Sequence, residues 1–265
     1  ICGSAIIEEQ IDFKKLEKAV KIVYKKHDNF RLQLNIKDGE VEQVLSDKKE
    51  IQIGMLFVET PKELQKETEK VVRTPFKLEN SELYKFYIFK FDNGEGGFML
   101  NIHHLISDAW TLAFICNEII NTYSQLKQNK EIETKAIYSY IDYINAEQEY
   151  LQSEKYQKDK SYWEEKFATI PEVATIPGSK ENPNASNPAG ERKQFNLEVT
   201  EVDKIKQYCK ENKISLYNFF MAIYAIYIGE ISNLDEFVIG TPILNRTNFK
   251  EKNAAGMFIN MAPFK

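Results

Sequence analysis

The segment His103–Trp110, with the sequence HHLISDAW, holds the side chains of this chain that are best suited to moving protons. It contains two of the three histidines, and Asp108 follows His104 by four residues. Histidine exchanges protons readily because its ordinary pKa lies near neutral pH. A nearby aspartate can orient an imidazole, cap a helix or pair with a distant arginine. The segment is therefore the first candidate for a catalytic site.

A structural role for both histidines is the alternative, because buried and hydrogen-bonded histidines occur in many protein cores. On an extended backbone, successive side chains point to opposite faces, so only one of His103 and His104 can face a given cavity. His104 shares its parity with the apolar residues of 98–102, and this parity alone leaves open which face borders the cavity. A buried Asp108 needs a partner, because an uncompensated buried charge is costly.

Regular elements on both sides must position this segment. GFMLNI (97–102) alternates large side chains and predicts a buried strand, whereas residues 110–126 carry apolar side chains at helical spacing. HHLISD is then the connection between a strand and a helix. LYKFYIFKF (83–91), which precedes the turn sequence DNGEG, predicts an antiparallel hairpin with 97–102. Loops held by rigid elements are common seats of function.

The remaining pattern alternates further strands and helices. Strands are expected at 1–9, 30–36, 41–45, 236–242 and in the last residues. Helices are expected after Asp12, from Pro61 to about Arg73 behind a Thr60 cap, and over 137–167, 200–213 and 215–231. The mixture predicts an α/β protein.

The composition is that of an ordinary globular chain, with 265 residues, 43% hydrophobic side chains and room for one or two domains. A net charge of −5 without a basic block argues against nucleic acid or an anionic membrane as the main partner. No run of about 18 apolar residues predicts a membrane span. Three widely spaced cysteines predict neither a disulfide framework nor a zinc site and favour the reducing cytoplasm. Cys116, at an apolar helical position, is interpreted as a core residue rather than a nucleophile.

The strongest linker signal lies between residues 168 and 192, where four prolines, two glycines and several polar residues gather. We expect an N-terminal lobe over 1–170, a linker over 171–192 and the beginning of a C-terminal lobe over 193–265. The abrupt start at ICGSAI and the strand-like end at MAPFK indicate a piece of something longer.

HHLISDAW resembles the HHxxxDG signature of condensation domains from nonribosomal peptide synthetases, which belong to the chloramphenicol acetyltransferase-like superfamily. Three further elements stand in the family's order. VYKKHDNFRLQL (23–34) is similar to the RHExLR element, YSYIDY (138–143) to YxDY, and IGTPILNR with GMFIN (239–246 and 256–260) to GTPxxNR and GxFxN. The resemblance implies a two-lobed, V-shaped α/β fold with HHLISD at the cleft and with the second lobe incomplete.

Carried over position by position, the resemblance implies that His104 is catalytic and that His103 supports its loop. It implies a structural Asp108 paired with Arg246, for which a solvated loop charge is the alternative. The other implied positions are the scaffold residue Arg31, with His27 beside it, and the substrate-channel residues Ala109, Trp110 and Asn260. For Arg31 and His27, ordinary surface positions at a helix end are the alternative.

The activity that the resemblance implies is an acyl transfer that forms an amide bond. A donor acyl or peptidyl thioester would join the amine of an acceptor aminoacyl thioester. Phosphopantetheine arms of upstream and downstream peptidyl carrier domains would present both substrates, next to an adenylation domain, and the domain itself would bind no cofactor and no metal. His104 would take up the amine proton, or position the amine and donate a hydrogen bond to the oxyanion.

Departures from the family pattern leave alternatives open. Ala109 stands where the family usually has glycine, Ala146 replaces an aromatic residue often found after YxDY, and the family's first motif is absent. A coenzyme-A-dependent acyltransferase and an epimerization domain share the histidine motif, but the GTPxxNR and GxFxN segment favours condensation. A heterocyclizing relative would carry aspartates instead of the histidines. Intact His104 and Asp108 argue against a noncatalytic carrier-docking module.

Overall fold

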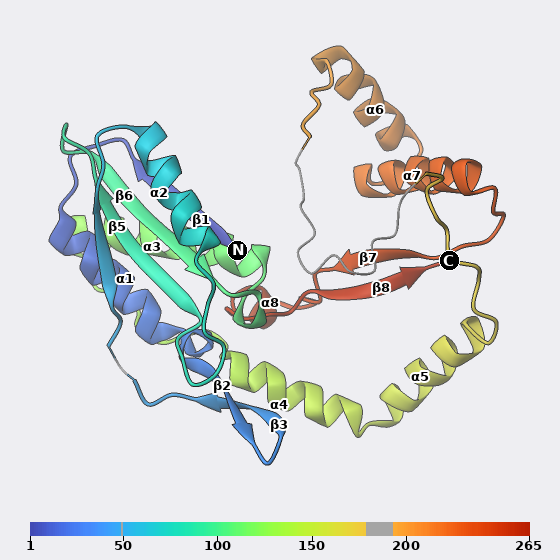
Figure 1. Cartoon of the computed structure of the whole chain (residues 1–265), viewed down its shortest axis with the longest axis horizontal. Coiled ribbons are helices and arrows are strands. Elements are labelled where there is room, and N and C mark those ends of the chain that lie inside the picture. Colours follow the sequence, from blue (N-terminus) through green and yellow to red (C-terminus); the bar gives the residue numbers. More distant parts are fainter. Residues whose placement is uncertain (49, 179–192) are drawn as a thin grey trace. The chain divides into compact units, whose positions relative to one another are not determined.

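The computed structural model describes residues 1–48, 50–178 and 193–265. The chain divides into two compact units (Figure 1). Unit 1 comprises Ile1–Asp159 and Ile243–Asn260, and unit 2 comprises Lys160–Pro242 and Met261–Lys265. Residues 243–260 thus group with the N-terminal part of the chain. The expected linker at 171–192 lies partly outside the described residues, and the expected lobe boundaries stay a prediction.

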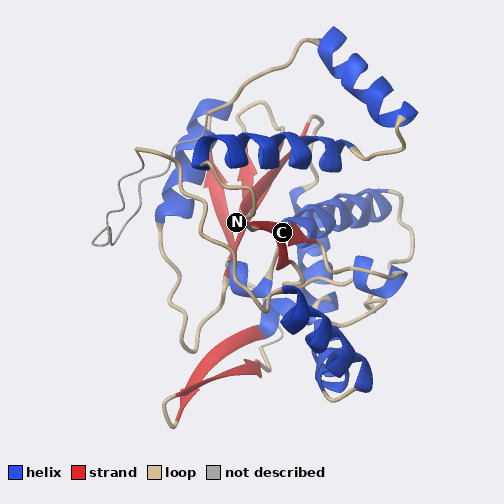
Figure 2. Ribbon diagram, turned by 90° about the vertical axis from the view of Figure 1, so that its right-hand side faces the viewer, coloured by secondary structure: helices blue, strands red, loops and turns tan. Residues whose placement is uncertain are grey.

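Unit 1 is built on a four-stranded sheet, whose strands are drawn in red in Figure 2. Its order is β1 (Cys2–Ile7), β6 (Gly96–Ile102), β5 (Tyr84–Lys90) and β4 (Ile53–Phe57). Strand β6 pairs antiparallel with both neighbours, and Tyr84 lies opposite Ile102, which confirms the predicted hairpin. The sequence pattern did not predict β4, which adds to the edge of β5 in the parallel direction.

Helices cover both faces of this sheet. On one face, α1 (Phe13–Lys26) packs against α3 (Ala109–Lys127) over the even-numbered residues of β5 and β6, among them Phe86, Ile88, Phe98, Leu100 and Ile102. On the other face, Leu64 of α2 (Pro61–Arg73) packs with Val58, Phe89 and Phe91. Each large side chain buried in this way contributes about 1.5–3 kcal/mol relative to exposure. The end of β6, and with it His103, is therefore held between two packed layers.

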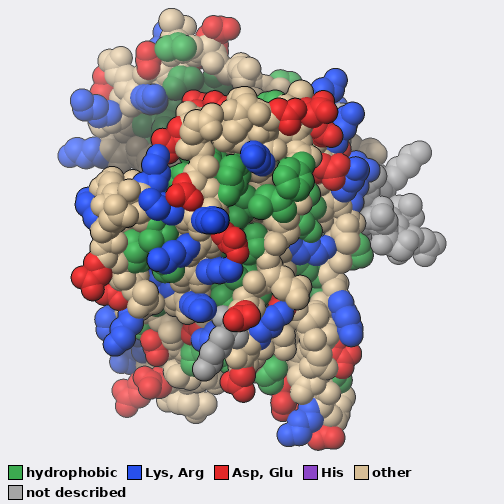
Figure 3. Space-filling view, turned by 90° about the vertical axis from the view of Figure 1, so that its left-hand side faces the viewer, with side chains coloured by type: hydrophobic (Ala, Val, Ile, Leu, Met, Phe, Trp, Pro, Cys, Tyr) green, Lys and Arg blue, Asp and Glu red, His purple; other side chains and the backbone are tan. Residues whose placement is uncertain are grey.

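Helix α1 is amphipathic. Its buried side carries Leu16, Ala19, Val20, Val23 and Tyr24, and Asp12 caps its first turn by accepting a hydrogen bond from the Lys15 N–H. The exposed side carries Lys14, Lys18, Lys21 and Lys25 at helical spacing. Lysine and arginine side chains gather on the face shown in Figure 3, the side on which α1 lies in Figure 1. The apolar and charged sides of the helix follow the predicted pattern.

Shorter elements complete unit 1. The turn η1 (Asp28–Arg31) leads into the hairpin β2 (Leu32–Lys37) and β3 (Glu40–Leu45), and η2 (His104–Ile106) follows β6. The single helix expected over 137–167 is two helices, α4 (Tyr140–Leu151) and α5 (Glu154–Lys166), the second of which crosses from unit 1 into unit 2 after Asp159. They separate at Ser153, whose Oγ accepts a hydrogen bond from the Tyr156 N–H and so caps the second helix. Helix α8 (Phe249–Lys252) is a single turn.

Unit 2 contains α6 (Val199–Glu211), α7 (Leu216–Ser232) and most of the two-stranded sheet of β7 (Ile239–Ile243) and β8 (Asn260–Phe264). The end residues Ile243 and Asn260 of these strands group with unit 1. Helix α7 is apolar around its whole circumference, and much of it is exposed, with Ile226 67% and Tyr217 52% accessible. Within the described part of the chain, no single helix is long and apolar enough to cross a membrane. Helices α6 and α7, bent by 102° at their junction, meet that length and composition test only as a pair.

Candidate active site

The histidine segment begins where β6 ends. The His103 N–H donates to the carbonyl of Leu83 (2.8 Å), so its backbone still belongs to the β5–β6 ladder. The His103 ring lies edge-on to Phe76 with 5.6 Å between centroids, and its Nδ1 accepts a hydrogen bond from the Leu105 N–H (3.2 Å). Burial lowers the pKa of His103. Because Nδ1 accepts this hydrogen bond, the contact favours the tautomer that carries its proton on Nε2.

His104 lies differently, because it is the first residue of η2 and its side chain is exposed. Side chains alternate between the two faces of the sheet as far as His103, which meets Phe76 on the face opposite to that of Ile102. At His104 the backbone has already turned into the 3-10 conformation, so the expected alternation between the two histidines does not apply there. The turn, rather than strand parity, directs the His104 imidazole outward.

Asp108 anchors the other end of the segment and is fully buried. One carboxylate oxygen caps α3 by accepting the Thr111 N–H (2.8 Å), and the other accepts from Arg246 Nη1 (2.6 Å) and from the N–H groups of Phe258 (3.0 Å) and Ile259 (3.3 Å). Burial alone would raise the pKa of Asp108. The hydrogen bonds from Arg246 and from the backbone outweigh burial and hold this pKa below its ordinary value.

Arg246 completes the pair from residues 243–260 of unit 1. Its side chain is 0% exposed, so the alternative of a solvated loop charge is wrong, and the expected contact with Asp108 is present. Its Nη2 donates to Thr111 Oγ1 (2.8 Å), and its guanidinium carbon lies 3.9 Å from the centroid of the Phe258 ring. The guanidinium has a flat face as well as several N–H donors, so it can stack on a ring while its edge forms hydrogen bonds.

Thr111 and Gly256 lock the same stretch of residues 254–260 onto α3. Thr111 Oγ1 donates to the Gly256 carbonyl (2.7 Å) and lies 3.1 Å from the Gly256 N–H. A Cβ on Gly256 would overlap the ring of Tyr140, whose hydroxyl donates to the Met257 carbonyl (2.8 Å). Glycine is required here because the backbone passes directly against an aromatic ring.

The other expected site residues take varied positions. Ala109 is the first residue of α3, is exposed and has no positive φ, so its backbone does not need the glycine usual in the family. Trp110 is 39% exposed, and its Nε1 donates to the Lys252 carbonyl (3.1 Å). Asn260 is an exposed residue at the start of β8, and Arg31 is a half-buried residue at the end of η1. The channel role of Ala109, Trp110 and Asn260 stays a prediction.

The alternative of a surface position is wrong for His27, because this residue is only 2% exposed. Its Nε2 lies 2.5 Å from Glu118 of α3, which also accepts from Lys26 Nζ (2.5 Å), and its ring meets Phe114 edge-on. Burial would raise the pKa of Glu118, but the hydrogen bonds from His27 and Lys26 lower it. Glu118 was not predicted, because its partners lie on a helix that only the fold brings near.

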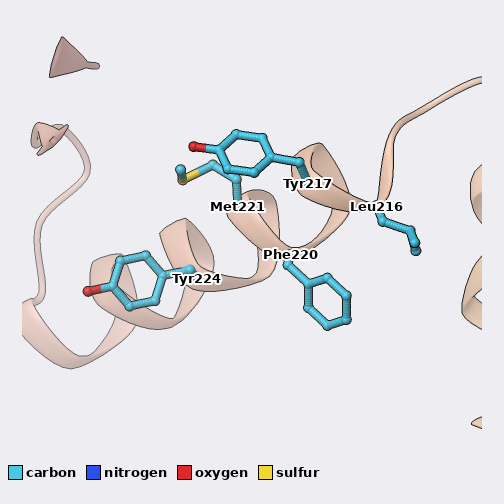
Figure 4. Close-up of a pocket in the computed structure, with 5 residues that line it drawn as sticks. All are labelled: Leu216, Tyr217, Phe220, Met221 and Tyr224. Atoms are coloured by element: carbon cyan, nitrogen blue, oxygen red, sulfur yellow. The ribbon is translucent and has the colours of Figure 1, made fainter. Parts of the chain in front are cut away.

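A hollow of about 330 Å³ lies along α7 and is lined by Leu216, Tyr217, Phe220, Met221 and Tyr224. Figure 4 shows Tyr217 and Met221 on one side of the helix and Phe220 pointing away from them. The hollow is apolar and carries none of the expected site residues. In the described part of the chain, no group of three or more His, Cys, Asp or Glu side chains is arranged to hold a metal ion.

Comparison with known proteins identifies the family. The condensation domain family model matches residues 3–265. The chain belongs to the condensation domain family. It is 29% identical over 270 residues to surfactin synthase subunit 1 of Bacillus subtilis (strain 168), covering 99% of this chain and 7% of that protein. It is 28% identical over 262 residues to gramicidin S synthase 2 of Aneurinibacillus migulanus, covering 98% of this chain and 6% of that protein.

Solved condensation domains share the fold. The condensation domain of the monacolin K polyketide synthase MokA matches with a TM-score of 0.80 at 19% identity, covering 99% of this chain and 61% of that chain. The first condensation domain of the calcium-dependent antibiotic synthetase, in complex with substrate analogue 3a, matches with a TM-score of 0.77 at 16% identity, covering 99% and 62%. The predicted α/β, chloramphenicol acetyltransferase-like fold is confirmed. The chain spans about three-fifths of the length of these solved condensation domains.

The motif resemblance is confirmed at the level of the family. In this condensation domain, Arg246 of IGTPILNR and the Phe258 N–H of GMFIN both bond the buried Asp108 carboxylate of HHLISD. Gly256 of GMFIN bonds Thr111 on the helix that Asp108 caps. Elements that are far apart in the sequence thus form one structure around the base of α3.

Proposed function

We propose that this chain is the part of a nonribosomal peptide synthetase condensation domain that supplies the catalytic imidazole, His104, for amide-bond formation. The observation that carries the proposal is the contrast between an exposed His104 and the fully buried Asp108–Arg246 pair four residues away. One side chain is free to meet a substrate, while the loop beneath it is fixed by charge-assisted hydrogen bonds.

The proposed reaction joins a donor acyl or peptidyl thioester to the amine of an acceptor aminoacyl thioester. The amine nitrogen attacks the thioester carbonyl carbon, the C–N bond forms, the C–S bond breaks, and the phosphopantetheine thiol of the donor carrier leaves with a proton. An α-amine titrates near pH 8, so an appreciable fraction is already neutral and a strong base is not required. We therefore assign to His104 the positioning of the amine and partial uptake of its proton.

The proposed partners follow from the reaction. An upstream and a downstream peptidyl carrier domain would present the two substrates, and an adjacent adenylation domain would load the acceptor. The phosphopantetheine arms belong to the carriers and enter as parts of the substrates. We also propose the cytoplasm as the compartment, on the strength of three widely spaced cysteines that the structure leaves unpaired.

The test is single-turnover condensation in the full-length protein, with a loaded donor carrier and a loaded acceptor carrier. His104→Ala is expected to lower the rate by about 100-fold or more, because general acid–base groups contribute on this scale. His104→Gln separates the two roles, since glutamine donates a hydrogen bond but exchanges no proton at neutral pH. Carrier binding, measured in parallel, must remain unchanged in both variants.

Near-normal turnover by His104→Ala would remove this imidazole from the mechanism. Carrier binding by the unaltered protein without any amide product would instead favour a noncatalytic docking module. A His104→Gln rate well above that of His104→Ala would assign the larger share to positioning.

A further inference from the structure

The turn η1 sends its side chains to three different elements. Asp28 accepts hydrogen bonds from the N–H groups of Tyr140 (2.9 Å) and Ile141 (3.4 Å) and so caps α4, while Phe30 packs in the aromatic core. Asn29, between them, points to the histidine segment, where its Nδ2 donates to the carbonyl of Ile106 (3.1 Å). Asn29 is 0% exposed.

The partner of Asn29 lies at the centre of the segment that matters for the proposed reaction. Ile106 is the last residue of η2, two positions after His104. The two ends of the segment are fixed elsewhere, by the His103 N–H on Leu83 and by the bonds of Asp108. Asn29, which lies far from this segment in the sequence, bonds the turn between these two ends.

Apolar packing alone does not explain an asparagine here. Its Oδ1 is buried and has no hydrogen-bond partner among the described residues. A buried acceptor left unpaired costs free energy; a leucine of nearly the same shape would remove Oδ1 but would leave the Ile106 carbonyl without its donor. What the amide supplies is therefore its hydrogen bond to the backbone of η2 rather than better packing.

We propose that Asn29 is a positioning residue for His104. By holding the Ile106 carbonyl, it fixes the 3-10 turn and thereby the direction in which the imidazole leaves the backbone. The support is rigid, because His27 is tied to Glu118 of α3 and Phe30 lies between Tyr24, Tyr84 and Phe86. The inference rests on the proposed function, since it assigns Asn29 a role through His104.

A double-mutant cycle on the full-length protein tests the inference in the same condensation assay. Asn29→Leu is expected to lower the single-turnover rate by about 10-fold to 100-fold when His104 is present, because misplacement by about 1 Å has effects of this size. In the His104→Ala background, the same change is expected to alter the residual rate by less than about twofold. A purely structural role would lower both rates by the same factor.

The matched control is Asn101→Leu. Asn101 is also a buried asparagine, 4% exposed, but its Nδ2 donates to the Val71 carbonyl of α2 rather than to the histidine segment (3.4 Å). The single-turnover rate of Asn101→Leu is expected to stay within about twofold of that of the unaltered protein. Hydrogen exchange of the Leu105–Ser107 amides gives a second readout, which should quicken in Asn29→Leu while α1 and α3 stay protected.

Equal rate losses in both backgrounds, or an unchanged rate with unchanged exchange at Leu105–Ser107, would overturn the role of Asn29 and leave the proposed function standing. A full rate in His104→Ala alone would overturn the proposed function and the positioning role with it. Asn29→Ala, which removes the amide without adding apolar bulk, enters the same cycle if Asn29→Leu does not fold.

Discussion

Breaking the buried pair of Asp108 and Arg246 should be among the most damaging single changes in unit 1. In Asp108→Asn, the amide can offer its oxygen either to Thr111 or to the three donors from Arg246, Phe258 and Ile259, but not to both. It therefore loses at least the helix cap, about 1 kcal/mol, and leaves a cation with 0% exposure and no counter-charge. Breaking one side of a buried pair costs about 3–5 kcal/mol in total.

Arg246→Met should cost a similar amount, about 3–5 kcal/mol, because it leaves the carboxylate buried with only backbone donors. The double variant Asp108→Asn with Arg246→Met removes both charges, so its cost should fall below the sum of the single costs by about 0.5–3 kcal/mol. The free energy of unfolding is measured by urea denaturation. Trp110 offers a local fluorescence signal, because its indole bonds to the Lys252 carbonyl beside the pair.

Two results would contradict this reasoning. A cost below about 1 kcal/mol for either single variant would mean that the side chain is solvated, as surface ion pairs are. Single costs that add fully in the double variant would mean that the two charges do not interact.

Three further outcomes follow from contacts in unit 1. Gly256→Ala should lower the free energy of unfolding by about 1–3 kcal/mol in urea denaturation, because the new Cβ would overlap the Tyr140 ring. In a Tyr140→Ala background the same change should cost less, and an equal cost in both backgrounds would contradict this cause. The free energy of unfolding should fall as the pH drops from about 5 toward 2, because Asp108 and Glu118 have lowered pKa values in the folded protein. Such carboxylates contribute stability above their unfolded pKa and lose it as they are protonated. Asp108→Asn and Glu118→Gln should each flatten this pH profile, and an unchanged profile would refute the contribution of that carboxylate. Cys116 should react slowly with iodoacetamide at about pH 7.5 by mass spectrometry, because burial raises its pKa to about 11, and labelling as fast as a free thiol would refute this.

The frame of the site was predictable from local pattern. The hairpin at 83–91 and 97–102 and the helix after Asp108 were expected from spacing and are present as β5, β6 and α3. Asp108 was expected to need a partner, because buried charge must be compensated. The identity of that partner came from the motif resemblance, since residue chemistry alone does not choose among distant arginines.

Other features depend on contacts that leave no trace in a local pattern. The bond from Asn29 joins a side chain to a backbone carbonyl, and every residue has a carbonyl, so no spacing indicates it. The burial of His27 depends on how α1 packs against α3. Strand β4 escaped prediction because IGMLF has a glycine in its interior and pairs in parallel with β5 only through the crossover of α2.

The same contacts set an order of events during synthesis. The core of unit 1 includes Ala254, Ala255 and Phe258, which the ribosome adds only after the whole stretch 160–242. At about 5–20 residues per second, roughly 5–20 s separate the synthesis of residue 159 from that of residues 254–258. During that interval the core of unit 1 lacks these three side chains, and Asp108 lacks its partner Arg246. The packing around even the first strands of unit 1 is therefore completed only after residues 243–260 have been made.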